Sequence, residues 1–235
     1  MIASLLLGVS FLSLDTYVPL YVQGAKGGGA SAAATVVTPV MLTWALSGIV
    51  AAPLVVRWGF RKTALAGCVL TVISFLGLVI CAVVSAPRGV LTSVLLLSGL
   101  GFGPASMAYL LASQNAVAWQ QRGIITSGIQ FFRTFGGAVG IGLMGMLFNI
   151  LCAPQMKQLQ NLGINTDDLL DPRKRSKLPD EVIRSASGMI GHGLTWVFAA
   201  MLIFAAAQIV VTFLLPNRKA DHAVSRAEMM EAMAG

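Results

Sequence analysis

Two charged side chains stand inside otherwise uncharged apolar segments. Asp15 is the one charged residue between Met1 and Gln23, and Arg133 is the one between Gly123 and Cys152. A charge at the centre of a membrane segment costs about 2.5–3.5 kcal/mol on insertion scales, so such groups usually face a watery cavity or a partner. A carboxyl group there can take up and release protons, and a guanidinium can contact a substrate. We therefore predict that Asp15 couples transport to protons or recognises cations, and that Arg133 lines the same cavity.

The two charges are also candidates for an ion pair. Counted along a helix, Asp15 lies about 21 Å from Met1, and Arg133 lies about 16 Å from Arg122, so we expect similar depths. Three less specific interpretations stay open. Asp15 is an interfacial residue near the outer end of its helix, the two charges form a structural pair, or Arg133 extends its side chain toward the membrane surface.

Other polar and aromatic residues are candidates for the same pathway. Gln130 precedes Arg133 by about one helical turn and shares its face. Further residues that could contact a substrate are Tyr17, Tyr21, Trp44, Tyr109, Gln114 and Asn115.

Enzyme chemistry has no basis in the sequence. The two histidines, His192 and His222, are far apart, and three cysteines form no CxxC pair or Cys/His cluster. No paired intramembrane carboxylates and no nucleophile with a neighbouring base occur. We predict no enzyme, no metal and no cofactor. The 16 basic residues are scattered over the loops, the tail and one predicted span and form no basic face interleaved with aromatic residues, which excludes a nucleic-acid-binding face.

The elements that position these residues are membrane helices. Charged residues make up 11% of the 235-residue chain, against about 25% in soluble domains. Long uncharged windows are wide enough for spans of about 20 residues. The prediction is an all-α polytopic membrane protein with six helices, at 2–23, 33–56, 63–84, 90–112, 124–151 and 190–215. It forms one membrane domain: spans 1–4 in residues 1–112, span 5 in 113–152, a long extracytoplasmic loop at 153–189, span 6 and a cytoplasmic tail at 216–235.

Glycines mark where helices approach closely. Gly99 and Gly103 form one GxxxG pair, and Gly136 and Gly140 form another. Small residues allow close backbone contact between membrane helices, so we predict a packing role for these four.

The distribution of basic residues predicts the orientation in the cell membrane. With both termini in the cytoplasm, the two inner loops and the tail hold seven Lys and Arg residues, whereas the two short outer loops hold only Lys26 and Arg88. That is the positive-inside bias. The loop 153–189 opposes it with six basic residues, although the cluster at 173–177 lies far from either span.

Five stretches in register resemble a known family. They are DTYVPLYVQ (15–23), RWGFRK (57–62), SGLGFGP (98–104), RGIITSGIQFFRTFGGAVGIGLMGMLFN (122–149) and, in the last loop and span, LPDEVIRSASGM with WVFAAML and FLLPNRKA. Together they resemble the C-terminal half of a major facilitator superfamily transporter, of the fourteen-span, EmrB/QacA-type drug:proton antiporter branch. In RWGFRK, Arg57, Gly59, Arg61 and Lys62 match the family's cytoplasmic loop motif.

The resemblance implies one six-helix bundle made of two inverted three-helix repeats. It also implies efflux of amphipathic or hydrophobic small molecules by alternating access, driven by the proton gradient. The partners would be the lipid bilayer, a small-molecule substrate and a second six-helix bundle, from a missing N-terminal half or another chain. Two alternatives stay open, a homodimeric half-transporter for a small solute and an inactive membrane remnant or scaffold.

Overall fold

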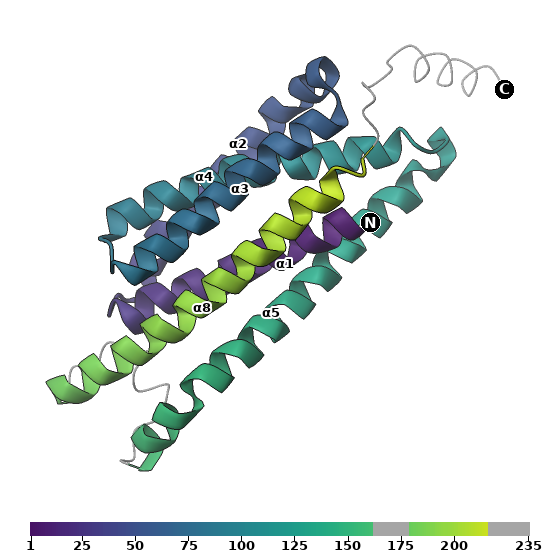
Figure 1. Cartoon of the computed structure of the whole chain (residues 1–235). Helices are drawn as coiled ribbons and strands as arrows, with labels where there is room; N and C mark the ends of the chain where they lie inside the picture. Colours follow the sequence, from purple (N-terminus) through teal and green to yellow (C-terminus); the bar gives the residue numbers. More distant parts are fainter. Residues whose placement is uncertain (162–178, 216–235) are drawn as a thin grey trace.

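The computed structural model describes residues 1–161 and 179–215. Six long helices carry this part of the chain (Figure 1): α1 Ile2–Leu20, α2 Ala30–Trp58, α3 Phe60–Val83, α4 Arg88–Gln114, α5 Arg122–Asn161 and α8 Asp180–Thr212. A π-helical turn, η1 (Tyr21–Ala25), extends α1, and a 3-10 turn, η2 (Trp119–Gln121), precedes α5. All six are long and apolar enough to cross a membrane, which confirms the predicted all-α, six-span fold.

The last two helices extend beyond their apolar cores. α5 continues to Asn161 and α8 begins at Asp180, so both ends of the interval predicted as the loop 153–189 are helical. Hydropathy marks only the part of a helix that lies in lipid, whereas the helix itself persists until its sequence stops it. Pro179 stands at the N-cap of α8, where a missing N–H costs nothing. The basic cluster at 173–177 and the tail at 216–235 lie outside the described residues.

The helices pack in a pattern with internal symmetry. α1 packs along α5 as α4 packs along α2, and α1 on α8 corresponds to α4 on α3. Exchanging α1 with α4, α2 with α5 and α3 with α8 leaves the set of packed pairs unchanged. Two three-helix repeats of inverted topology produce this pattern. In Figure 1, α2, α3 and α4 lie together on one side, and α1 and α8 lie between them and α5.

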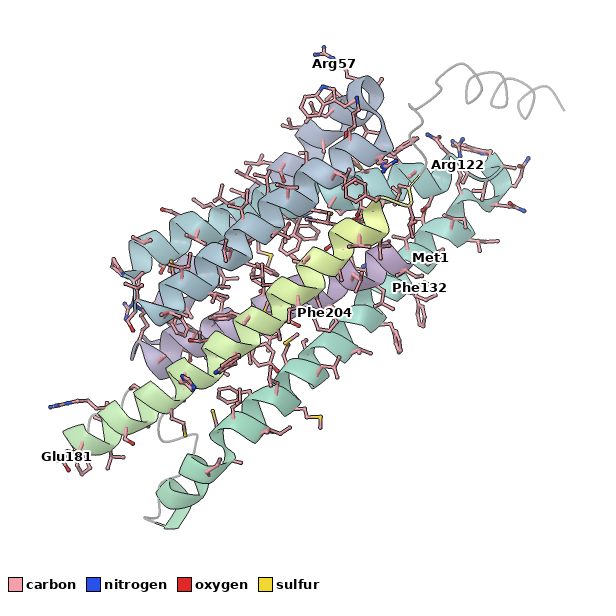
Figure 2. The ribbon with its side chains drawn as sticks, in the orientation of Figure 1. Met1, Arg57, Arg122, Phe132, Glu181 and Phe204 are labelled. Carbon is pink, nitrogen blue, oxygen red and sulfur yellow. The ribbon has the colours of Figure 1, made fainter. Side chains whose placement is uncertain are left out.

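Alternation of helix direction separates the two ends of the bundle. Met1, Arg57 and Arg122 lie toward one end, and Glu181 lies at the opposite end (Figure 2). The end opposite Met1 also holds Lys26, whose ammonium donates to the carbonyls of Ser85 and Ala86 and so ties the two connections there together.

Glycine lets α1 and α5 touch backbone to backbone. A Cβ added at Gly140 would lie 2.8 Å from the Cα of Val9, and one at Gly136 would lie 2.9 Å from the Cα of Leu5. Both separations are shorter than an ordinary carbon–carbon contact of about 3.5–4.0 Å. The absence of side chains at these positions therefore sets the distance between the helices.

Glycine also allows close backbone contact between α2 and α4. A Cβ at Gly103 would lie 2.8 Å from the carbonyl carbon of Ser47, and one at Gly99 would lie 3.0 Å from the Cβ of Thr43. The hydroxyl of Ser47 donates to the carbonyl of Gly99 at 3.0 Å, which adds a polar contact to the close approach. Glycine contact and an interhelical hydrogen bond thus fix this crossing.

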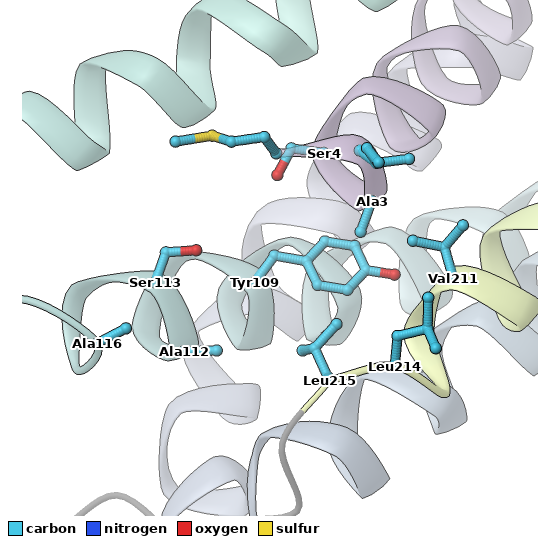
Figure 3. A pocket seen from close by; sticks show the side chains of 11 residues that line it. Ala3, Ser4, Tyr109, Ala112, Ser113, Ala116, Val211, Leu214 and Leu215 are labelled. Carbon is cyan, nitrogen blue, oxygen red and sulfur yellow. The ribbon is translucent and has the colours of Figure 1, made fainter.

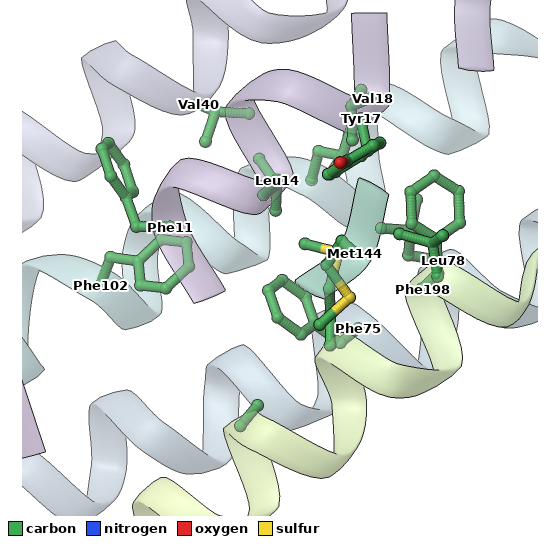
Figure 4. Close-up of a cluster of buried hydrophobic side chains, with 14 of the residues drawn as sticks. Phe11, Leu14, Tyr17, Val18, Val40, Phe75, Leu78, Phe102, Met144 and Phe198 are labelled. Atoms are coloured by element: carbon green, nitrogen blue, oxygen red, sulfur yellow. The ribbon is translucent and has the colours of Figure 1, made fainter. Parts of the chain in front are cut away.

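An aromatic and aliphatic core fills the space between the helices (Figure 4). The ring of Phe102 in α4 meets Phe11 of α1 edge-on at 5.2 Å and Phe75 of α3 at 6.2 Å. Tyr21 meets Phe198 of α8 in a similar geometry at 5.6 Å. Edge-to-face pairs of this kind add about 0.5–1.5 kcal/mol beyond their buried area, so one group of rings links α1, α3 and α4, and a second pair links η1 to α8.

A buried polar cluster joins α3, α4 and α8. The hydroxyls of Tyr109 and Thr212 lie 2.6 Å apart, the thiol of Cys68 lies 3.2 Å from Tyr109, and the amide of Gln208 donates to Tyr109 at 3.2 Å. All four side chains are buried. Shared hydrogen bonds among buried groups fix the register of the three helices.

Candidate functional site

A cavity of about 330 Å³ lies between α2, α4 and α5. Its size is at the lower end of small-molecule sites. The polar and aromatic side chains on its walls are Trp44 of α2, Ser106 of α4, and Thr126, Gln130 and Arg133 of α5. Met107, Leu110 and Ile129 add apolar surface. The cavity can therefore hold the apolar part of a small molecule and present one cation and several hydrogen-bonding groups to its polar part.

Helical spacing brings the α5 residues to one wall. Thr126, Ile129, Gln130 and Arg133 stand at intervals of three, four and seven, which places them on one helix face. The sequence predicted Gln130 and Arg133 as pathway residues, and the structure brings both to this cavity. It did not predict Thr126, although the position seven residues before Arg133 was the signal that could have identified it.

Arg133 and Trp44 form the centre of the site. The guanidinium of Arg133 lies over the Trp44 ring, 5.6 Å from its centroid. The Trp44 ring also packs against Phe11 of α1, with centroids 4.6 Å apart, so it contacts both α1 and α5. A cation over an indole face gains about 0.5–2 kcal/mol, which offsets part of the cost of holding Arg133 half-buried.

Gln114 and Asn115 occupy different environments at the end of α4. The Gln114 amide donates to the hydroxyl of Thr126 at 2.9 Å, and this bond joins α4 to α5 beside the cavity. Asn115 caps the helix and is exposed. It is absent from the cavity lining, so the structure brings only Gln114 near the site.

Asp15 and Arg133 do not lie at the same depth. A Cβ at Gly8 would lie 3.0 Å from the Cα of Arg133, so Gly8 of α1 lies at the level of Arg133. Asp15 lies seven residues farther along α1, about 10 Å by helical rise. Within the described ranges no carboxylate lies within 4.0 Å of Arg133. The expected pair is therefore not formed, and Asp15, half-buried on α1, does not line this cavity.

The expected pair was wrong because the two helices do not start at the same level. The side chain of Met1 reaches Gly128, at 3.1 Å from the position of an added Cβ, and Gly128 is six residues into α5. Counting depth from Met1 and from Arg122 therefore used two different origins. Only the crossing of the helices shows the offset.

Tyr17 lies in the interface between α1 and α5. Its side chain is 5% exposed, and its hydroxyl donates to the carbonyl of Ile141 in α5 at 2.7 Å. Figure 4 shows the ring among the core side chains. Tyr17 strengthens the α1–α5 crossing as Ser47 strengthens the α2–α4 crossing.

The RWGFRK stretch makes a tight turn between α2 and α3. Gly59 has a φ of 85°, a conformation that side-chain-bearing residues rarely adopt. The guanidinium of Arg61 lies over the ring of Phe213, 5.1 Å from its centroid, and Arg57 and Lys62 are exposed. Gly59 thus reverses the chain, and the three basic residues gather at this end of the bundle.

A second cavity of about 470 Å³ opens at the end of the bundle that holds Met1. Tyr109 projects into it between Ala3 and Ser4 of α1 on one side and Val211 of α8 and Leu214, just beyond α8, on the other (Figure 3). The described residues contain no cluster of three or more His, Cys, Asp or Glu suited to a metal.

Comparisons with known proteins agree with this architecture. A family profile described as Major Facilitator Superfamily matches residues 1–141. The chain is 30% identical over 143 residues to the multidrug transporter protein MdtP of Bacillus subtilis, covering 61% of this chain and 26% of that protein. It is 23% identical over 229 residues to multidrug resistance protein 3 of the same organism, covering 91% of this chain and 44% of that protein.

A third relative is the uncharacterized MFS-type transporter Rv1877 of Mycobacterium tuberculosis, 24% identical over 216 residues, with 91% of this chain and 31% of that protein covered. The chain thus spans less than half the length of these curated relatives. The matching profile covers more than half of the chain, and six apolar helices in this packing fit the same assignment. The chain belongs to the major facilitator superfamily, whose members are membrane transporters and not enzymes.

Proposed function

We propose that the chain forms one half of a proton-coupled exporter of amphipathic or hydrophobic small molecules. The observation that carries this proposal is the cavity between α2, α4 and α5, where Trp44 and Arg133 offer an aromatic face and a cation to one ligand. Two relatives named as multidrug proteins support the substrate class. By resemblance, the chain corresponds to the C-terminal half of the EmrB/QacA-type branch.

A second six-helix bundle completes the pathway in this proposal. α2 and α5 are the two least buried spans, and both expose large apolar side chains. On α2 and α5 these include Leu46, Ile49, Phe131, Phe135, Val139 and Met146. A second bundle packed on these faces would enclose the cavity, and rocking of the two bundles would open it to each side in turn.

Asp15 is the proposed proton-binding group. It is the one acidic residue within the described membrane spans apart from Glu181 at the start of the last. It is half-buried on α1, about 10 Å along the helix from the level of Arg133. A carboxyl group placed away from a cation can change its protonation without breaking an ion pair.

The orientation proposed is with both termini in the cytoplasm. Met1, Arg57 and Arg122 lie toward one end of the bundle (Figure 2), and this end would face the cytoplasm of the cell by the positive-inside rule. The test is accessibility of single cysteines introduced at Arg57 and Arg88 in intact cells to an impermeant thiol reagent. Labelling at position 57 but not at position 88 would refute this orientation.

Transport is tested in proteoliposomes with an imposed pH gradient. The chain is reconstituted alone and with the complementary bundle of a related transporter, and the flux of a fluorescent amphipathic substrate is followed. We expect gradient-driven flux with both bundles, reduced at least about tenfold by Asp15→Asn, because removal of a titratable group abolishes coupling. Gradient-independent flux, or full coupling in the variant, would refute proton coupling at Asp15.

A homodimeric half-transporter is the second candidate, favoured by the exposed apolar faces of α2 and α5. Gradient-driven flux by the chain alone, together with a dimer in detergent, would support it over a heterologous second half. Absence of flux under both conditions would support a non-transporting remnant.

A further inference from the structure

Arg133 has no acidic counterpart in its cavity. None of the residues that line the cavity is Asp or Glu, and Asp15 lies about 10 Å farther along α1. Arginine stays protonated at every physiological pH. The cavity therefore carries a permanent positive charge that no described side chain neutralises.

The guanidinium is held in place while its N–H groups stay available. The guanidinium lies over the Trp44 ring, and that ring packs against Phe11. None of the five N–H donors of Arg133 has an acceptor in the described part of the chain. A planar fork of free donors matches the two oxygens of a carboxylate, or of a sulfonate or phosphate, in two parallel hydrogen bonds.

Apolar surface adjoins this charge. Met107, Leu110 and Ile129 lie on the same cavity walls as the Trp44 ring, and a volume of about 330 Å³ accommodates a small aromatic or branched aliphatic group. Ser106, Thr126 and Gln130 supply the remaining polar contacts. The arrangement offers one cationic pole and one apolar pole to a single ligand.

We propose that this cavity selects amphipathic anions, with the acidic group on Arg133 and the apolar group against Trp44. The inference rests on the proposed function because it names the substrate class of the same site. A lipophilic cation would gain the Trp44 face only by displacing the guanidinium, and it would then meet a like charge in a low-dielectric site.

The test is equilibrium dialysis of the full chain in nanodiscs of zwitterionic phosphatidylcholine. Three probes share one aromatic group and differ in charge: 2-naphthoate, 2-naphthamide and 2-naphthylmethyl-trimethylammonium. We expect naphthoate to bind at least about tenfold more tightly than the amide, equivalent to about 1.4 kcal/mol, and the cation to bind most weakly. Equal binding of the three probes, or preference for the cation, would overturn the proposal.

Variants assign the preference to Arg133. Arg133→Gln should bring naphthoate within about twofold of the amide, and Arg133→Lys should retain part of the preference because the charge remains without the fork. Arg88→Gln removes an exposed positive charge at the start of α4, at the end of the bundle opposite Met1. This control should leave the binding of all three probes unchanged. If Arg133→Gln does not fold, the wild-type ranking and Arg133→Lys still decide. Unchanged anion preference in a folded Arg133→Gln variant would overturn the proposal.

The outcome is separable from that of the transport assay. Arg133-dependent anion binding without gradient-driven flux would refute the exporter and support the anion site. Gradient-driven export of cations that is insensitive to Arg133→Gln would support the exporter and overturn the anion site.

Discussion

The α1–α5 crossing depends on Gly140, and a matched substitution two residues away isolates that dependence. A methyl group at Gly140 would lie 2.8 Å from the Cα of Val9 and 3.0 Å from the hydroxyl oxygen of Ser13. Because the first of these atoms belongs to the backbone, relief requires α1 and α5 to move apart. At Gly142 an added methyl meets no heavy atom within 4 Å.

Overpacking of this kind costs about 1–3 kcal/mol, which corresponds to a decrease in Tm of about 3–10 °C for a chain of this size. Gly140→Ala should show that decrease. Gly142→Ala should keep the wild-type Tm within about 2 °C or raise it, because alanine favours helix over glycine by about 1 kcal/mol.

Cys68, Cys81 and Cys152 provide the assay. All three thiols are buried, so a fluorogenic thiol reagent reacts with them only as the bundle opens on heating in detergent. Equal shifts for Gly140→Ala and Gly142→Ala would refute the reasoning, because both variants gain the same helix propensity and differ only in the neighbouring helix.

Three further predictions follow from single contacts. Gly48→Leu should abolish naphthoate binding in the dialysis assay, because Gly48 lines the cavity and a larger side chain would fill it. The Tm should stay near wild type, because an added Cβ at Gly48 meets no atom within 4 Å. Retained binding would place the ligand elsewhere. Tyr109→Phe should lower stability by about 1–3 kcal/mol in the thiol assay, because the buried Thr212 and Gln208 lose their shared partner; an unchanged Tm would show that the cluster contributes nothing. Burial lowers the pKa of Lys26 below 10.5, so the folded chain loses this proton at a lower pH than the unfolded chain does. The free energy of unfolding should therefore rise with pH between the folded-state and unfolded-state pKa of Lys26. Lys26→Gln should lack that rise when Tm is followed from about pH 8.5 to 10.5, and a parallel rise in the variant would exclude Lys26 as its source.

Local sequence features determined most of the fold. A helix in lipid satisfies its own backbone, so an uncharged window of sufficient length predicts a span wherever it occurs. Within a span, helical periodicity places residues three apart on one face, so Arg133 and Gln130 could be assigned to one helix face from their spacing alone. GxxxG spacing likewise predicted that Gly99, Gly103, Gly136 and Gly140 lie where helices meet, and each of them faces a neighbouring helix.

Only the tertiary structure decided which residues meet across helices. Spacing along one helix says nothing about the offset of the next, and a shift of a few residues moved Asp15 away from Arg133 and placed Tyr17 against Ile141. The contact between the Arg133 guanidinium and the Trp44 ring, with residue numbers 89 apart, depends on how α2 and α5 cross their neighbours. Helix formation is set by neighbours in sequence, whereas the site is set by glycine contacts and ring packing between helices, and these appear only when the bundle is assembled.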